Sequence, residues 1–179
     1  METQLNYNIE KIAKKHAIAC HRMMNHKYDG DKDYEFHLSM AIKIGKFFED
    51  NISEKDRGIV FAAIWSHDTL EDCQLLCSYS DLTKLLGSHV SNIVKSVTTG
   101  TGTRKERFTD EYYKGIRETQ YATFVKLCDR IANVQHGLNN KKPILDMYRK
   151  EHNHFKEMLY VKDEYRNMWN LLDYLIKQE

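Results

Sequence analysis

Apolar residues along this chain recur mostly at spacings of three and four positions, and few segments alternate with a period of two. The chain holds one proline and eight glycines, so little interrupts these stretches. Because a helix brings every third or fourth residue to one face, the pattern predicts a nearly all-α protein. The expected helices span about residues 6–24, 35–51, 53–67, 82–86, 88–97, 111–118, 121–134, 146–160 and 163–177, with a short turn or helix at 70–76.

Polar residues at the ends of these stretches predict where helices begin and end. Ser53 offers an N-cap hydroxyl ahead of an acidic first turn. Ser80 and Asp81 are candidates for the cap of the short helix that follows, and Gly87 is expected to end it.

Two loops and no linker are expected between the helices. Segments 98–103 and 139–143 are rich in residues typical of loops. The chain shows no internal repeat and no low-complexity tract. Residues 1–179 are therefore expected to form one domain, which is long enough to bury a sizeable core.

Charge and hydropathy make several classes of function improbable. Lys and Arg number 27 and Asp and Glu number 26, so a net charge of +1 gives no reason to expect nucleic-acid or membrane-surface binding. No apolar run approaches the roughly 20 residues that cross a bilayer. Residues 1–7 lack the basic and apolar regions of a signal peptide. A cytoplasmic protein is therefore expected.

The four cysteines show no spacing that indicates a structural zinc site. They are Cys20, Cys73, Cys77 and Cys128, and no CxxC pair occurs among them. Reduced thiols that lie partly in the core are the expectation.

The segment with the clearest chemistry follows the apolar run 59–65. His67 and Asp68 come directly after it, and residues 67–72 hold one histidine and three carboxylates. Charges that emerge from an apolar helix need a partner or a metal ion. Adjacent helical residues point about 100° apart, so both side chains can reach one ion only near a helix end or kink.

Further polar residues interrupt apolar helices elsewhere. His37 opens the helix at 35–51, and Asp129 lies inside the helix at 121–134, with Asn133 four residues later on the same face. Two imidazoles and two carboxylates suit Mn²⁺, Fe²⁺ or Zn²⁺, which activate bound water and polarise phosphoryl oxygens. Glu71 and Asp72 would lie one turn further on and could orient water or move protons.

Three segments carry a resemblance to a known family. Residues 34–41 match its Tyr-x-x-His helix start, residues 67–72 its His-Asp-Thr-x-Glu-Asp run, and residues 126–133 its Lys-Leu-x-Asp-Arg-x-x-Asn run. On these motifs the chain resembles the HD-domain phosphohydrolases. Within them it is most similar to the RelA/SpoT hydrolase domain and to the stand-alone small alarmone hydrolases of the metazoan SpoT homologue type. The likeness covers roughly residues 9–140.

The resemblance implies a fold and a reaction. The fold is an all-α HD-domain helical bundle. The reaction is removal of the 3′-pyrophosphate from guanosine tetra- or pentaphosphate, giving GDP or GTP and pyrophosphate. The resemblance also implies a Mn²⁺ site, although the ligand types alone permit Fe²⁺ or Zn²⁺. The ligands would be His37, His67, Asp68 and Asp129.

The resemblance also assigns roles around the ion. Glu71 and Asp72 would activate or position the attacking water, and Asn133 would contact the substrate near its ribose. The residues after the resembling segment are too few for a synthetase region, so an enzyme that only hydrolyses is expected.

The segment that the resemblance implies would hold the purine departs from the family pattern. The family carries an Arg-Lys pair where this chain has His26 and Lys27. Imidazole can stack on a base, but it lacks the permanent charge and the five donors of arginine. The metal chemistry is therefore better supported than guanine specificity.

The basic run after the first loop offers candidate phosphate contacts. Arg104, Lys105 and Arg107 follow a flexible segment, and in the family basic residues near this point face the substrate phosphates. A solvated charged face is an equally good interpretation, because acidic residues interleave with them.

Two alternatives stay open from sequence. One is an HD phosphohydrolase for another nucleotide, such as an adenosine alarmone, a deoxynucleotide or a reduced nicotinamide phosphate. The other is a module that binds a nucleotide without cleaving it, against which the full set of ligands and carboxylates argues. In every case the expected partner is a small-molecule nucleotide, and the oligomeric state is open.

Overall fold

The computed structural model describes residues 2–178, with side chains from residue 8 onward. Helices dominate the described chain, which confirms the predicted all-α class, and one short hairpin is the only sheet within it. The elements are α1 (Glu2–Met23), β1 (Lys27–Tyr28), β2 (Lys32–Asp33), α2 (Glu35–Phe47), η1 (Glu49–Asn51), η2 (Glu54–Asp56), α3 (Arg57–Ser66), α4 (Thr69–Asp72), α5 (Tyr79–Leu86), α6 (Ser88–Val97), α7 (Arg104–Arg107), α8 (Asp110–Glu118), α9 (Ala122–Asn139), α10 (Ile144–Leu159) and α11 (Arg166–Ile176).

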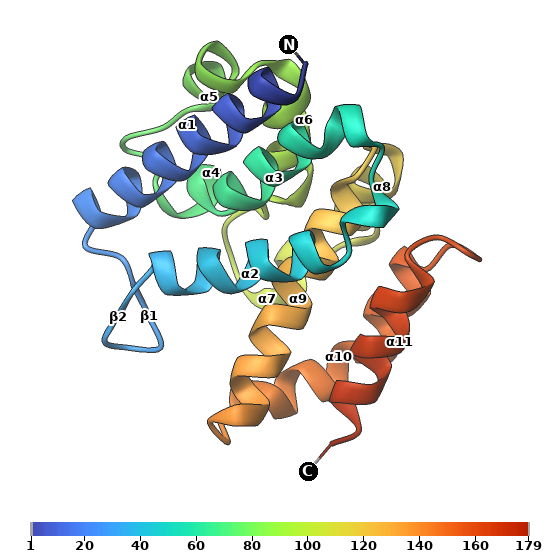
Figure 1. The fold of residues 1–179 in the computed structure, drawn as a ribbon. Helices are drawn as coiled ribbons and strands as arrows, with labels where there is room; N and C mark the ends of the chain where they lie inside the picture. Colours follow the sequence, from blue (N-terminus) through green and yellow to red (C-terminus); the bar gives the residue numbers. More distant parts are fainter. Residues whose placement is uncertain (1, 179) are drawn as a thin grey trace.

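Two helices form the centre of the fold (Figure 1). Helix α3 contacts α1, α2, α6 and α9, and every residue from Val60 to Ser66 is buried. Apart from Ser66 that run is apolar on all sides, so it has no face suited to water. Helix α9 packs against α2, α3, α10 and α11. Helix α1 and the last two helices consequently lie on opposite sides of the molecule.

The close approach of α2 to this centre depends on Gly45. A Cβ atom at that position would overlap the Cδ1 atom of Ile64 in α3 and would lie 3.6 Å from the sulfur of Cys128 in α9. A residue without a side chain therefore sets how near α2 comes to both central helices. His37 lies on the same helix, so this packing also sets its position.

The expected cap at Ser53 is wrong. The Ser53 side chain makes no capping hydrogen bond, and the 3-10 turn η2 comes between it and α3. The backbone N–H of Asp56 donates to the carbonyl oxygen of Ser53 at 2.8 Å. The chain thus enters the helix through a tight turn that satisfies backbone groups without the hydroxyl.

The cap of α5 also differs from the prediction. Ser78 is the N-cap in place of Ser80, and the helix begins three residues earlier than expected. The Ser78 Oγ accepts from the backbone N–H of Asp81 at 3.2 Å, and the Asp81 carboxylate accepts from the backbone N–H of Ser78 at 3.1 Å. The predicted end is confirmed, because Gly87 has a φ of +84°.

The hairpin between α1 and α2 is an element that periodicity did not predict. Strands of two residues are too short to show an alternating pattern. Asp29 in the turn accepts from Nε2 of His136 at 3.0 Å and from Nζ of Lys142 at 3.1 Å. Helix α9 runs to Asn139, beyond its predicted end, and its buried His136 is the residue that meets the hairpin turn.

Two expectations from composition can be compared with the structure. All four cysteines are free and buried, in agreement with the expected reduced thiols. No helix within residues 2–178 combines the length and the apolar character that a membrane crossing requires.

Candidate metal centre

Three parts of the fold bring polar side chains to one point between α2, α3 and α9. His37 lies in the first turn of α2, and Asp129 lies in the middle of α9. His67 and Asp68 form the junction at which α3 ends and α4 begins. Adjacent residues were predicted to reach one ion only at a helix end, and this pair lies at such an end.

Local hydrogen bonds fix the junction between α3 and α4. The Thr69 hydroxyl donates to the carbonyl oxygen of Ser66 at 2.7 Å. Nδ1 of His67 lies 2.8 Å from the carbonyl oxygen of Ile64, so this nitrogen carries the hydrogen and donates it. In the neutral ring Nε2 then holds the lone pair, and it is the atom that faces the other three side chains.

The four side chains converge closely. The Nε2 atoms of His37 and His67 are 3.1 Å apart. Oδ2 of Asp68 lies 2.9 Å from His67 Nε2 and 3.5 Å from His37 Nε2. Oδ1 of Asp129 lies 3.4 Å from His37 Nε2 and 3.8 Å from His67 Nε2. Both imidazoles are buried, and the two carboxylates are largely buried.

This arrangement fits a divalent cation. Ligand atoms bound at about 2.0–2.2 Å lie roughly 3 Å or slightly more from one another, which is the range observed. Two imidazole nitrogens and two carboxylates form a donor set that suits Mn²⁺, Fe²⁺ or Zn²⁺. The ligand atoms of His37, His67 and Asp129 all lie within 4.8 Å of one another.

Electrostatics at the centre favour a bound positive charge. Burial alone would raise the pKa of Asp68, but the charge of His67 in its protonated form, and the hydrogen bonds that protonated His37 and His67 donate, hold that pKa well below its ordinary value. Burial likewise opposes ionisation of Asp129, and Lys126 and the two imidazoles outweigh it and lower the pKa. The two carboxylates in turn raise the pKa of each imidazole against the effect of burial. Two carboxylates held ionised at one buried point require cations beside them.

Side chains behind the ligands hold them in place. The Tyr34 hydroxyl donates to Asp68 Oδ2 at 2.6 Å. Lys126 Nζ donates to Asp129 Oδ2 at 3.0 Å, and Asn133 Nδ2 donates to Asp129 Oδ1 at 2.6 Å. Outer partners of this kind orient metal ligands and tune their basicity.

Asn133 lies beside the centre, one turn of α9 after Asp129. Its Oδ1 accepts a hydrogen bond from the Tyr28 hydroxyl at 2.8 Å, while its Nδ2 donates to Asp129. The structure thus brings Asn133 to the site, and its predicted contact with substrate stays a prediction.

The two residues of the predicted catalytic pair, Glu71 and Asp72, lie in different surroundings. Glu71 accepts hydrogen bonds from the backbone N–H of Thr99 and from Arg107, both at 3.0 Å, so it joins the loop after α6 to the site. Burial, together with the charges of Asp68 and Glu71, raises the pKa of Asp72 to about 7. A carboxylate with that pKa can take up a proton near neutral pH.

Three of the four candidate ligands and the predicted catalytic pair lie at a cavity of about 270 Å³. His37, Asp68, Asp129, Glu71 and Asp72 all line it. Basic side chains line it as well, and they are Arg104, Arg107, Lys126 and Arg130. A larger hollow of about 800 Å³ between α6 and α8 shares Arg107 but includes none of the candidate ligands.

These four basic side chains form a basic wall of the cavity, and residues of α10 hold two of them in place. Arg104 and Arg130 both pair with Glu151, at 2.8 Å and 3.4 Å from its Oε2. The Arg130 guanidinium also lies 4.4 Å from the centre of the Tyr148 ring. Two guanidinium groups on one carboxylate leave net positive charge facing the cavity, which suits a phosphorylated ligand.

The predicted substrate contacts do not all reach this cavity. Lys27 pairs with Asp33 on the hairpin at 2.6 Å and does not line the cavity, and Lys105 is exposed on α7. His26 does line it, and its ring stacks on Tyr34 with the centres 4.0 Å apart. The roles of these residues in substrate binding stay predictions.

Several residues of the site were not identified from sequence. Tyr34 and Lys126 lie within recognised motifs, and Lys126 precedes Asp129 by three residues, which is a spacing that places both on one helix face. Tyr28, Tyr148 and Glu151 had no such signal, because each comes from an element whose approach to the site depends on tertiary packing.

Comparison with known proteins identifies a related fold. No family model matches the chain, and no curated protein sequence does. A solved structure is similar, and it is described by the words "A metazoan ortholog of SpoT hydrolyzes ppGpp and plays a role in starvation responses". The two chains are 22% identical, with a TM-score of 0.74 over 95% of this chain and 94% of the other. The two proteins therefore share a fold, and the resemblance seen in the motifs is confirmed at that level.

Proposed function

We propose that this chain is a metal-dependent phosphohydrolase that removes the 3′-pyrophosphate of guanosine tetra- or pentaphosphate, giving GDP or GTP and pyrophosphate. The observation that carries the proposal is the convergence of two imidazoles and two carboxylates, from three parts of the fold, beside a cavity with a basic wall. The motifs and a fold shared with a protein described as hydrolysing ppGpp support the same substrate class.

The cation would be Mn²⁺, with Fe²⁺ or Zn²⁺ as alternatives that the same donors accept. When bound, such an ion lowers the pKa of water and polarises a phosphoryl oxygen. The residues that would hold it are His37, His67, Asp68 and Asp129.

The remaining side chains would move the proton and bind the phosphates. The oxygen of water forms a bond to the phosphorus attached to the ribose O3′, and the bond between that phosphorus and O3′ breaks. Asp72 accepts the proton of the water and can return it to O3′, because its pKa lies near 7. Arg104, Arg107 and Arg130 offer the donors that phosphate oxygens need.

The proposal is tested by incubating the purified full chain with guanosine tetraphosphate and Mn²⁺. Anion-exchange chromatography should show GDP and pyrophosphate in equal amounts. Asp129→Asn should lower the rate by at least about a hundredfold, since losing an outer partner of a ligand alone costs up to that much. His89→Gln replaces an exposed histidine away from the centre and is the matched control.

Two results would count against the proposal. One is the absence of pyrophosphate with Mn²⁺, Fe²⁺ and Zn²⁺ alike. The other is an Asp129→Asn variant that stays folded and as active as the wild type.

A second candidate is hydrolysis of a different nucleotide, and the position of His26 favours it. Residue 26 is a histidine, so no guanidinium is available at this position to hold a guanine. One face of its imidazole is already occupied by Tyr34, and its Nδ1 lies 3.5 Å from Asp72. A panel with an adenosine alarmone, a deoxynucleoside triphosphate and a reduced nicotinamide phosphate separates the two. The guanosine proposal requires that guanosine tetraphosphate be the preferred substrate.

A further inference from the structure

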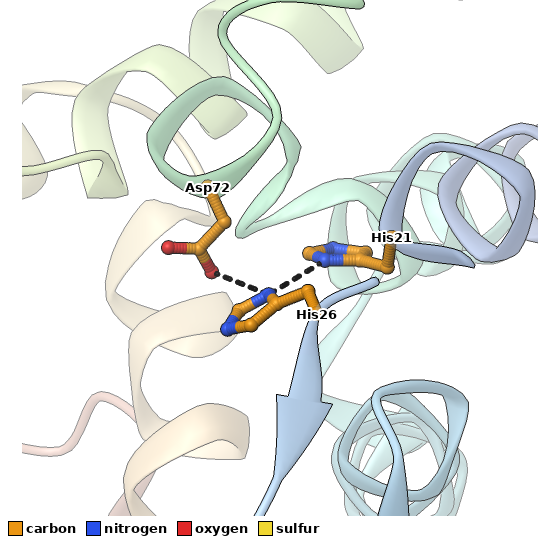
Figure 2. A group of neighbouring side chains, drawn as sticks. All are labelled: His21, His26 and Asp72. Atoms are coloured by element: carbon orange, nitrogen blue, oxygen red, sulfur yellow. Dashed lines mark hydrogen bonds and ion pairs between the residues drawn. The ribbon is translucent and has the colours of Figure 1, made fainter. Parts of the chain in front are cut away.

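A second cluster of histidine and carboxylate side chains lies beside the candidate metal centre. His21 comes from the last turn of α1, His26 directly precedes β1, and Asp72 ends α4. Figure 2 shows His26 between the other two, with its ring turned toward both. None of these three side chains belongs to the four candidate ligands of the first centre.

The separations within this cluster match those between ligands of one ion. Nδ1 of His21 and Nδ1 of His26 are 3.0 Å apart, and His26 Nδ1 lies 3.5 Å from Asp72 Oδ2. The three ligand atoms all lie within 4.8 Å of one another. Around a tetrahedral ion with bonds of about 2.0–2.1 Å, neighbouring ligand atoms lie roughly 3.3 Å apart. The observed distances fall on both sides of that value.

The rings are held in place without an ion. Tyr34 stacks on His26 at 4.0 Å and on His21 at 4.2 Å between ring centres, with interplanar angles of 19° and 22°. His21 is buried, with 1% of its surface exposed, and the buried Cys73 sulfur lies 3.5 Å from its Nδ1. A site whose ligands are already oriented loses little entropy when a cation binds.

The site is open to the cavity on one side. His26 and Asp72 line the cavity of the first centre, and their side chains are 32% and 29% exposed. A cation can therefore reach them from solvent, and three protein ligands leave a fourth position for water or for an oxygen of an anionic ligand.

We propose that His21, His26 and Asp72 bind a second divalent cation. Two imidazole nitrogens and one carboxylate favour a borderline ion of the Zn²⁺ type over Ca²⁺ or Mg²⁺, which prefer oxygen ligands. The two cations would share no ligand, but Tyr34 connects their sites, because its ring stacks on both imidazoles and its hydroxyl bonds Asp68. The second site goes beyond the proposed function and does not rest on it. While a cation is bound there, Asp72 is a ligand and is not available to accept the proton of the water, so the second cation would slow the proposed hydrolysis.

Metal stoichiometry tests the second site directly. The tag-free full chain is stripped with a chelator and titrated with Zn²⁺ against a chromophoric chelator, and bound zinc is counted by elemental analysis. Wild type and His89→Gln should bind two ions per chain. His26→Gln and Asp129→Asn should each bind one, and the double variant should bind none.

A second variant guards against local misfolding. Asp72→Asn keeps the size of the side chain and removes the charge, so it should weaken one equivalent by at least about tenfold while the other is retained. Circular dichroism and thermal melting establish that each variant is folded. If His26→Gln does not fold, Asp72→Asn decides the outcome.

The outcomes separate this inference from the proposed function. The second site would be overturned if His26→Gln and Asp72→Asn both bound two ions with the affinity of the wild type. It would also be overturned if the wild type bound only one ion and Asp129→Asn lost that ion. A wild type with one ion that His26→Gln removes and Asp129→Asn keeps would uphold the second site and remove the first.

Discussion

At the residue scale, the candidate metal centre depends on which atom of each side chain faces inward. His67 is the clearest case, because the carbonyl oxygen of Ile64 takes its Nδ1 hydrogen and leaves Nε2 to face the centre. Asp129 is held from both sides, by Lys126 on one oxygen and by Asn133 on the other. His67 and Asp129 are therefore each oriented by a hydrogen bond made on the side away from the centre, through Nδ1 and Oδ2 respectively.

Tyr34→Phe tests this orientation at Asp68. The change removes the hydroxyl that donates to Asp68 Oδ2 at 2.6 Å but keeps the ring that stacks on both imidazoles. We expect the affinity for Mn²⁺ to fall by about 10–100-fold, because the carboxylate loses the bond that orients it. Competition with a fluorescent chelator measures the change.

The matched control is Tyr79→Phe, which removes a hydroxyl that bonds Asn92 away from both clusters. Its Mn²⁺ affinity should equal that of the wild type. Equal affinities in Tyr34→Phe and Tyr79→Phe would show that the Tyr34 hydroxyl does not orient Asp68.

At the scale of elements, the centre exists because α2 lies close to α3 and α9. Gly45 permits this approach, since a Cβ atom there would overlap Ile64. The helices carry the ligands at fixed positions, so a change in their spacing changes every distance in the centre.

Gly45→Ala should therefore destabilise the fold by about 1–3 kcal/mol, the usual cost of overpacking a core. The midpoint of urea denaturation measures this. Gly115→Ala is the control in another helix, where a Cβ atom meets nothing within 4 Å. There the higher helix propensity of alanine should stabilise the protein by up to about 1 kcal/mol. A destabilisation of equal size in both variants would mean that packing at Gly45 is not the cause.

The contact between α10 and α11 predicts a dependence of stability on pH. Asp173 in α11 accepts from His152 at 2.7 Å and from Lys156 at 2.6 Å, both in α10. Partial burial would raise the pKa of Asp173, but these bonds outweigh it and lower that pKa. The stabilisation is thus present above the ordinary carboxyl pKa and is lost as pH falls through the lowered value.

Comparison of wild type with Asp173→Asn measures this contribution. At about pH 7 the free energy of unfolding of the variant should be lower by up to about 1 kcal/mol, the usual value for a partly exposed pair. The difference should shrink below about pH 4 and vanish as Asp173 becomes protonated. A difference that stays constant over this range would contradict the assignment.

At the scale of the whole molecule, the candidate ligands connect parts of the chain that are far apart in sequence. His37, His67 and Asp129 come from three elements, and the basic wall adds Glu151 and its partners from α10. A cation held there would link these elements in the folded state only.

Mn²⁺ should therefore raise the melting temperature of the chelator-stripped chain. At a free concentration of about 100 times the dissociation constant, binding to the folded state adds about 2.7 kcal/mol. Differential scanning calorimetry over a series of Mn²⁺ concentrations measures the shift. Asp129→Asn should show a clearly smaller shift, and an equal shift in that variant would place the stabilising ion elsewhere.

The sequence by itself determined the fold class and predicted the ligands of the candidate metal centre. Spacings of three and four predicted the helices, because amphipathic periodicity is a local property of the chain. His67 and Asp68 were expected at a helix end, and they lie at the junction of α3 and α4. The four candidate ligands could be named before the structure because each lies in a short motif with its own spacing.

Tertiary structure alone decided what surrounds that centre. The hairpin, the approach of Glu151 and the stacking of Tyr34 on both His21 and His26 join residues with no periodic or motif signal between them. Tertiary packing also gave Asp72 its raised pKa, since burial and neighbouring charges cause that shift and neither is a property of the local sequence. Local patterns specify elements and side-chain types, whereas distances between elements depend on how the whole core packs.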